Sequence, residues 1–539
     1  MHEQPIKKFL IFIIVAIYFI QGAVGITAIA DFILTKNAFT FSWIQIAMLS
    51  ALSTLAWSMK PIYGFLTDLV PIFGSRRKYY LVISSLLSVF GYYYLGLFGT
   101  NFLNIAIAII VFSIGLGFSD VIVDGMIVEN VPKETVGKYQ ALTWRAKAVG
   151  IFIASLFSGY ILERGVFSKL LDGSFILDFL HKFFSSAFPE ELIVSGVNMV
   201  DIRFTFFMAG TLSIISLVLS LVMRRQRVTE HRMEGIHHEI SLPYVFSGIG
   251  ALILTALTLI FISSAEKEFF SFIANDQLSS LLVIIIWSVW IYFYTAHLVK
   301  IGVAHTTLLF AALFLFLWRF TPSFGAPWSD YFINTLKLPQ EKIGLISSIL
   351  PISWFIGSII YTKFIDKIHL KKVLFWTVIF ASILSLSQLA LATPDLATAI
   401  GGNPVIKYFS AIILYPSYFF AYNSGAWGEL MTQSSILNLE AFLSFFLELM
   451  FIIAFLPLFK LAAVVTPKGV EATNFAVLMS IMNLGLAFGS LSGGMIYTYI
   501  EGDYILGGLT FSGLHITILI GAVTSLLCLL VLRRINVKV

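Results

Sequence analysis

Two aspartates, Asp120 and Asp124, interrupt an otherwise apolar stretch of the chain. A spacing of four residues places both carboxylates on one face of a helix. Two carboxylates that close together cannot both ionise cheaply, so one of them could carry a proton. Charged side chains inside long apolar segments are rare and costly, and a functional role is their default interpretation.

Two basic residues, Arg145 and Lys147, follow in the next apolar segment. Two positions correspond to roughly 200° of helix rotation, so only one of these side chains can face the aspartates. We expect Arg145 to do so, either as the partner of Asp124 or as a contact for an anionic ligand. A buried charge network that only locks two helices together is the alternative.

The second half of the chain offers fewer charges of this kind. Glu448 lies midway along an apolar segment and is a further candidate for carrying a proton, with a hydrogen bond between helices as the alternative. Arg319 could bind a carboxylate or stack on a flat ring, or extend to the membrane interface instead. Trp144 and Trp318 each adjoin an arginine and are the aromatic binding candidates; Gln21 is a polar one.

Long apolar segments hold these side chains. Hydrophobic residues make up 58% of the chain and charged residues 12%, and the mean hydropathy is +0.93. A soluble domain could not bury that much apolar surface. A bilayer core about 30 Å thick needs about 20 apolar residues as helix, and about 14 segments meet that requirement. The sequence therefore predicts an all-α polytopic membrane protein.

Loop charge predicts the orientation of these segments. With the N-terminus inside, the inner loops carry more Lys and Arg than the outer loops, so both termini are expected to be cytoplasmic, in the cell (inner) membrane. The pI of about 9.0 then reflects orientation rather than nucleic-acid binding. The pattern holds only if Ile406–Tyr422, broken by Pro416, does not cross. We expect that segment to be re-entrant or to lie in the outer interface.

The chain repeats itself weakly. The loop Pro132–Glu134 has a counterpart in Pro467–Gly469, and the charged cassette Trp57–Tyr80 has a fainter echo in Tyr361–Lys372. Matching positions in two halves predict two related bundles with a binding site between them near the midplane.

The repeat predicts three parts of the chain. Residues 1–223 and 301–539 would each form a six-span bundle, the second with the possible re-entrant segment near 406–422. Residues 224–300 would hold a cytoplasmic linker and two inserted spans.

Four motifs occur in order along the chain. They are the run Lys60-Pro61-Ile62-Tyr63-Gly64 with Asp68 and Arg76-Arg77, the run Ser119–Glu129 with its Ser-Asp-aliphatic-aliphatic-aliphatic-Asp pattern, Phe316 and Trp318 with Thr321-Pro322-Ser323, and Pro467–Ala472. Together these motifs resemble the folate-biopterin transporter family of the major facilitator superfamily. The resemblance implies two six-helix bundles, alternating access, and folate or a related pteridine as the small-molecule substrate. The two inserted spans depart from the family's twelve-span pattern.

The repeated cassette predicts a cytoplasmic gate. Asp68 precedes Arg76 and Arg77 in one half, and Asp366 precedes Lys371 in the other. We expect these charges to hold helix ends together when the pathway faces out, as a conformational latch rather than a substrate site.

An enzyme is the competing class, but the sequence contains no HExxH, Walker or Gly-x-Ser-x-Gly motif. The single cysteine, Cys528, excludes an intrachain disulfide, and neither a metal nor a cofactor is expected. We expect a secondary transporter coupled to protons through Asp120 and Asp124. A transporter of another organic anion or metabolite, or a receptor or assembly protein on the same fold, is the alternative.

Overall fold

The computed structural model describes residues 8–130, 136–189, 192–224, 306–322, 325–422, 426–465, 471–506 and 509–535, and between 249 and 292 only 249–251, 253–255, 257–258, 278, 281–290 and 292. The described chain is mostly helical. Its strands form two antiparallel hairpins, β1 (Ile193–Val194) with β2 (Val197–Asn198) and β3 (Asp503–Leu506) with β4 (Leu509–Ser512).

The first half of the chain forms one bundle of helices. Its elements are α1 (Lys8–Ala23), η1 (Val24–Thr27), α2 (Ala28–Phe32), η2 (Ile33–Ala38), α3 (Trp43–Ser58), α4 (Lys60–Leu69), α5 (Lys78–Phe98), α6 (Phe102–Asn130), α7 (Val136–Arg164), α8 (Val166–Leu170), α9 (Phe175–Phe183) and α10 (Met199–Val222). A capping box between Ser42 and Gln45 starts α3. Pro61 lies in the first turn of α4, where its missing N–H does no harm.

The second half forms a similar bundle. Its elements are α13 (Thr306–Arg319), α14 (Gly325–Asp330), η5 (Tyr331–Thr335), α15 (Gln340–Ser347), α16 (Ile349–Ile360), η6 (Tyr361–Ile365), α17 (Leu370–Leu386), α18 (Gln388–Ala392), α19 (Pro394–Gly401), α20 (Pro404–Tyr422), α21 (Ala426–Thr432), α22 (Ser435–Val465), α23 (Glu471–Ile500), α24 (Gly513–Ser525) and α25 (Cys528–Leu532).

Among the described residues, 10 helical segments are long and apolar enough to cross a membrane, or 11 if one bent pair counts as a span. The chain is therefore an integral membrane protein, but the predicted number of about 14 spans is not confirmed. The two inserted spans expected in Tyr244–Leu298 lie mostly outside the described residues. The span expected at Trp43–Phe65 is divided between α3 and α4, so neither helix is long enough alone.

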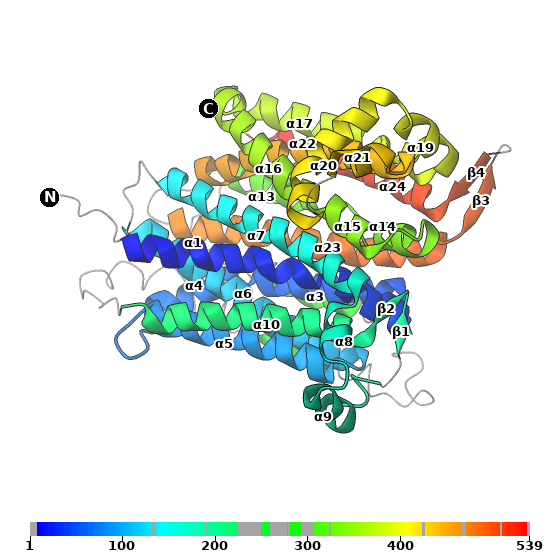
Figure 1. Ribbon diagram of the computed structural model, residues 1–539. Helices are drawn as coiled ribbons and strands as arrows, with labels where there is room; N and C mark the ends of the chain where they lie inside the picture. The colour runs from blue at the N-terminus through cyan, green and yellow to red at the C-terminus, as the bar shows by residue number, and fades with distance from the viewer. Residues whose placement is uncertain are drawn as a thin grey trace.

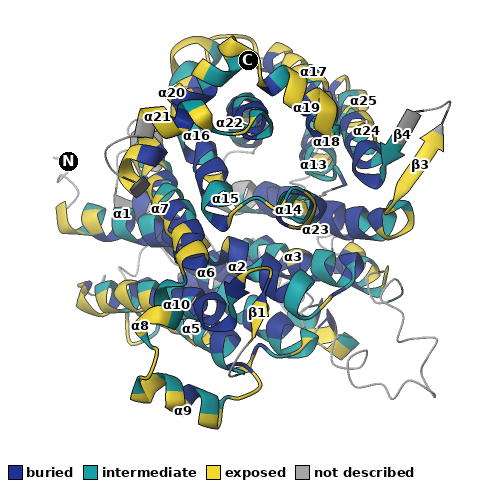
Figure 2. Ribbon diagram, turned by 45° about the vertical axis from the view of Figure 1, so that its right-hand side comes forward, coloured by how far each residue is buried: buried dark blue, intermediate teal, exposed yellow. Residues whose placement is uncertain are grey.

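The two bundles lie one above the other in Figure 1, with α7 and α23 between them. The marks for the two termini lie toward one end of the molecule, called the termini end below, and the β1–β2 and β3–β4 hairpins lie at the opposite, hairpin end. Buried residues gather where the bundles meet, and exposed ones lie on the outer rim (Figure 2). Many of the exposed side chains are large and apolar, as expected of a surface that faces lipid.

Several helix pairs join the bundles, and the most extensive are α3 with α23 and α7 with α15. Both pairs meet closely toward the hairpin end. A Cβ added at Gly344 would lie 2.5 Å from the carbonyl oxygen of Ser155, and one added at Gly494 would lie 2.3 Å from Cβ of Ala47. Small residues at such positions let helix backbones approach each other in a membrane.

Polar contacts close the same end. Asn334 donates a hydrogen bond of 3.0 Å to Asn37, and the backbone N–H of Gln340 donates one of 2.7 Å to Glu163. Arg164 and Glu341 form an ion pair at 3.4 Å. The hairpin end is therefore sealed by contacts that run from one bundle to the other.

The segment α19–α21 lies beside the second bundle, against α22. α19 and α20 are bent by 84° at a short break, which is compatible with either a broken span or a re-entrant loop. Thus the re-entrant path expected for Ile406–Tyr422 stays a prediction. α20 packs with α7 of the first bundle and with α15 and α22 of the second.

Candidate functional site

Five aromatic side chains gather where α7 meets α13, α16 and α22. The ring of Trp354 stacks on Phe451, with centroids 5.9 Å apart and an interplanar angle of 18°. Trp318 lies 5.8 Å from Phe451 and 6.0 Å from Phe455. Trp144 of α7 lies 6.1 Å from Trp354 and 6.3 Å from Phe455. We call these five side chains the aromatic cage; it includes side chains of both bundles.

Helix spacing and one glycine build the cage. Glu448, Phe451 and Phe455 lie at positions i, i+3 and i+7 of α22 and so share one face of the helix. Gly357 of α16 packs against that helix, and a Cβ added there would lie 2.3 Å from Cγ2 of Ile452. This close approach brings Trp354, on the same helix as Gly357, to Glu448.

Among the described residues, two cations and one anion lie against the cage. Lys147 Nζ of α7 lies 5.4 Å from the ring centroid of Trp144. The guanidinium carbon of Arg319 lies 5.8 Å from the ring centroid of Trp318 and 5.5 Å from that of Phe451. Its Nε is buried without a hydrogen-bond partner. Trp354 Nε1 donates a hydrogen bond of 3.0 Å to Glu448. Within the described part of the chain Arg319 and Glu448 form no ion pair, although each acts on the other electrostatically.

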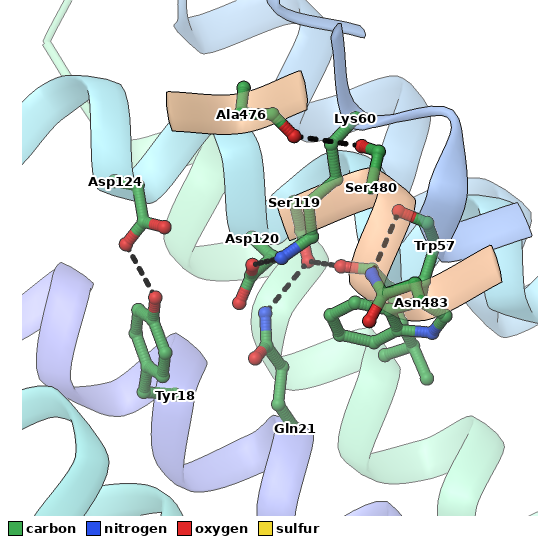
Figure 3. Close-up of polar contacts among 11 residues, drawn as sticks. Tyr18, Gln21, Trp57, Lys60, Ser119, Asp120, Asp124, Ala476, Ser480 and Asn483 are labelled. Atoms are coloured by element: carbon green, nitrogen blue, oxygen red, sulfur yellow. Dashed lines mark hydrogen bonds and ion pairs between the residues drawn. The ribbon is translucent and has the colours of Figure 1, made fainter. Parts of the chain in front are cut away.

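A second polar group lies inside the first bundle (Figure 3). Lys60, the first residue of α4, forms an ion pair of 2.6 Å with Asp120 of α6. Tyr18 of α1 donates a hydrogen bond of 2.5 Å to Asp124. Asp120 is buried and Asp124 half-buried. The two aspartates therefore belong to one network but have different partners.

Gln21 lies beside this network, in the interior of the first bundle. Its Nε2 donates a hydrogen bond of 3.3 Å to Ser119, and its Oε1 is buried without a described partner. Gln21 and several serines line a cavity of about 10 Å³, which is room for one water molecule. The structure thus places this predicted substrate contact away from the aromatic cage.

The expected pair between Arg145 and Asp124 is wrong. Arg145 is exposed, and its guanidinium lies 5.8 Å from the ring of Phe355. The other basic residue, Lys147, is half-buried, and its charge acts on both aspartates. Close packing fixes this rotation of α7, because a Cβ at Gly22 of α1 would lie 2.1 Å from the carbonyl oxygen of Lys147.

The first predicted gate lies at the termini end. Arg77 is only 4% exposed, donates a hydrogen bond of 2.7 Å to Thr67, and packs against Gly125, where a Cβ would lie 2.9 Å from its Cζ. Arg76 is half-buried. The side chain of Asp68 lies outside the described residues.

The second predicted gate is formed within the second bundle. Asp366 forms an ion pair of 2.8 Å with Lys460 of α22 and accepts a hydrogen bond of 3.3 Å from Tyr361. Lys371 donates a hydrogen bond of 3.3 Å to the backbone carbonyl of Arg533. The partner of Asp366 is therefore a lysine that the sequence did not single out. That these groups act as a latch stays a prediction.

Several site residues escaped the sequence reasoning. No sequence pattern distinguishes Trp354, Phe451 and Phe455 from lipid-facing rings, because aromatic residues make up 15% of the chain. Tyr18 gave none either. The sequence shows Lys60 as a charge beside Pro61, but it does not predict that a new helix, α4, begins at Lys60. Among the described residues, no group of three or more His, Cys, Asp or Glu could hold a metal ion.

Comparison with known proteins gives matches in both halves of the chain. Residues 21–183 and 440–536 match the BT1 family. A folate-biopterin transporter of Synechocystis sp. is 24% identical over 499 residues, which is 89% of this chain and 76% of that protein. A probable folate-biopterin transporter of Arabidopsis thaliana is 34% identical over 160 residues, 29% of this chain and 33% of that protein.

Solved structures share the fold at low sequence identity. A D-xylose-proton symporter superposes with a TM-score of 0.55 and 12% identity, covering 97% of this chain and 96% of the other. A POT family transporter superposes with a TM-score of 0.57 and 14% identity, covering 97% and 95%. Residues 21–183 and 440–536 thus match the BT1 family, and the chain is similar over most of its length to a folate-biopterin transporter, as the resemblance in the sequence predicted. Its fold is shared with these solved transporters.

Proposed function

We propose that this chain is a secondary active transporter that imports folate or a related pteridine by alternating access, coupled to protons. One observation carries the substrate class: an aromatic cage that includes side chains of both bundles and contains a guanidinium with no ion-pair partner among the described residues. A pteridine is a flat ring system, and flat rings stack favourably on aromatic side chains. Arg319, with its planar fork of N–H donors, can donate hydrogen bonds to an acceptor on the edge of such a ring.

The sealed hairpin end supports alternating access. Helix contacts and polar pairs join the bundles there, whereas the Arg77 and Asp366 contacts at the termini end each lie within one bundle. The hairpin end would face outside and the termini end the cytoplasm, with both termini inside. The Asp68, Arg76 and Arg77 cassette and the Asp366 and Lys371 cassette would then close the cytoplasmic side when the outer contacts open.

Asp124 is the carboxylate best placed to carry the coupled proton. Asp120 is already neutralised by Lys60 at 2.6 Å. The hydrogen bond that Asp124 accepts comes from the neutral hydroxyl of Tyr18. Lys147 is the other cation that acts on this pair of aspartates, and in the described chain it forms no ion pair with either of them. Asp124 can therefore gain or lose a proton with less damage to the fold than Asp120.

The transport of pteridines is tested by counterflow of labelled folate in proteoliposomes that contain the purified chain. Accumulation of label against preloaded unlabelled folate or biopterin is the expected result. No counterflow with any pteridine, together with exchange of another organic anion, would move the substrate to that class. No exchange at all would favour a receptor or assembly role on the same fold.

The coupling is tested with Asp124→Asn in the same vesicles. We expect counterflow to persist, because it needs no gradient, while the stimulation of uptake by an inward proton gradient disappears. Gradient-driven uptake that equals that of the unsubstituted chain would overturn the role of Asp124.

A further inference from the structure

Glu448 has an unusual setting for a half-buried carboxylate in an apolar span. It lies in a span of α22, with Trp354 as its described hydrogen-bond donor at 3.0 Å. Arg319 is near enough to act on it electrostatically but forms no ion pair with it. Leaving two half-buried opposite charges unpaired within membrane spans is costly unless a third group satisfies both. The setting therefore indicates a ligand that donates hydrogen bonds to the carboxylate and accepts them from the guanidinium.

The polar edge of a pteridine has that pattern. In the 2-amino-4-oxo ring, the ring N3–H and the 2-amino group are neighbouring donors, and the 4-oxo oxygen beside them is an acceptor. Two parallel N–H donors match the two oxygens of one carboxylate. Each carboxylate oxygen has two acceptor sites, so the bond from Trp354 leaves both oxygens of Glu448 able to accept.

The aromatic cage supplies the remaining contacts. Trp354 and Phe451 stack at 5.9 Å beside Glu448, and Arg319 lies over Trp318 and Phe451 with its Nε unpartnered. A flat ring held against these side chains would present one edge to both charges.

We propose that Glu448 is the specificity-determining residue of this site, accepting paired hydrogen bonds from the N3–H and 2-amino group of the pteridine ring, with Arg319 donating to the 4-oxo oxygen and Trp354 positioning the carboxylate. The assignment rests on the proposed function. It gives Glu448 a role in choosing the substrate rather than the proton-carrying role expected from the sequence.

The experiment compares two substrates within each variant. Labelled folate counterflow in proteoliposomes is competed with unlabelled folate and with 2-deamino-2-oxo-folate, in which an acceptor oxygen replaces the donor amino group. The ratio of the two inhibition constants does not depend on how much protein is folded. The unsubstituted chain should prefer folate by at least about 10-fold, because a site built around a donor group rejects an analogue that lacks it.

Glu448→Gln should bring that ratio close to 1, since the amide offers one acceptor and one donor instead of two acceptors. Trp354→Phe should keep the stacking ring and lower the ratio partly, because the carboxylate loses the bond that orients it. Glu440→Gln is the matched control: Glu440 lies two turns away on the same helix, is buried and is bonded to Ser444 at 2.7 Å, and its loss should leave the ratio unchanged.

The outcomes separate this proposal from the function itself. If folate counterflow is present and Glu448→Gln keeps the full preference for folate, the role of Glu448 is wrong and the transport of folate stands. If the unsubstituted chain exchanges folate and the deamino analogue equally, the site does not read this edge at all. If it exchanges neither compound, the proposed substrate class is wrong, and the proposed role of Glu448 is wrong with it.

Discussion

The two buried charge groups of this molecule differ in how completely they are satisfied. In the first bundle, Lys60 pairs with Asp120 and Tyr18 bonds to Asp124, so the carboxylates already have partners from the protein. In the aromatic cage, Arg319 and Glu448 lie near each other without pairing. A satisfied network stabilises the fold and can change its protonation, whereas an unsatisfied one has capacity left for a ligand.

The location of the two groups agrees with this difference. The network of the first bundle joins α1, α4 and α6 of that bundle. The cage joins α7 with three helices of the other bundle, so any ligand held there would contact both bundles. Coupling and substrate recognition would therefore reside in different halves of one pathway.

Removal of one partner of the satisfied network should have the largest effect. Lys60→Met leaves Asp120 buried and unpaired, which should lower the free energy of unfolding by about 3–5 kcal/mol. Thermal unfolding in detergent measures the change. The double variant Lys60→Met/Asp120→Leu should recover most of the loss, since no unpaired charge remains. A comparably large loss of stability in Arg319→Ala would contradict the conclusion that only the first of the two charge groups is satisfied by the protein itself.

Truncation in the cage should affect binding more than folding. Arg319→Ala should weaken folate affinity by about 10- to 100-fold, the range for loss of one charged hydrogen-bonding partner. Arg319→Lys should recover little, because an ammonium lacks the planar fork. Inhibition constants from counterflow give the values. A folate affinity of Arg319→Ala within a factor of two of that of the unsubstituted chain would show that Arg319 does not contact the substrate.

Replacing a glycine by alanine in each region tests the two regions separately. Gly357→Ala should push α16 away from α22, where a Cβ would lie 2.3 Å from Ile452, and distort the cage. Gly22→Ala should disturb α1 against α7 and hence the position of Lys147. Each should reduce stability by about 1–3 kcal/mol. Only Gly357→Ala should change the folate preference; a change of the preference in Gly22→Ala instead would contradict the separation.

The smallest effect is expected at Arg145. Because the side chain is exposed, Arg145→Ala should change the free energy of unfolding by less than about 0.5 kcal/mol, and folate uptake should stay within a factor of two. Lys147→Met is the contrasting variant and should reduce proton-driven uptake. A severe loss of uptake in Arg145→Ala would restore the substrate contact predicted from the sequence.

Hydropathy and charge were enough to predict the class of fold and part of the site. Asp120, Asp124, Arg319 and Glu448 stand out because each is a charge in an apolar segment, and all of them lie in one of the two groups. Their partners were not predictable, since a tyrosine or phenylalanine in so apolar a chain resembles any lipid-facing residue. The rotation of α7 depends on packing against Gly22 and is not readable from the spacing of Arg145 and Lys147 alone.

Burial of a charged side chain does not by itself indicate a role in binding or transport. Arg203 is fully buried, but its guanidinium donates hydrogen bonds of 3.1 and 2.8 Å to the backbone carbonyls of Leu95 and Gly99, at the end of α5. Those bonds satisfy carbonyls that a helix end leaves open. Arg203 thus has a structural role that its sequence context does not distinguish from the role of Arg319.

The helix α20 contacts the two bundles in different ways. Ser417 bonds to Ser348 at 2.6 Å and Ser410 to the carbonyl of Asn438 at 2.6 Å, so α20 is fastened to the second bundle. Against α7 it presents rings instead, with Phe420 6.1 Å from Phe152. The helix α20 is thus held to the second bundle by directional hydrogen bonds and meets the first bundle through an apolar ring contact, so its two sides differ in how firmly they fix the position of a neighbouring helix.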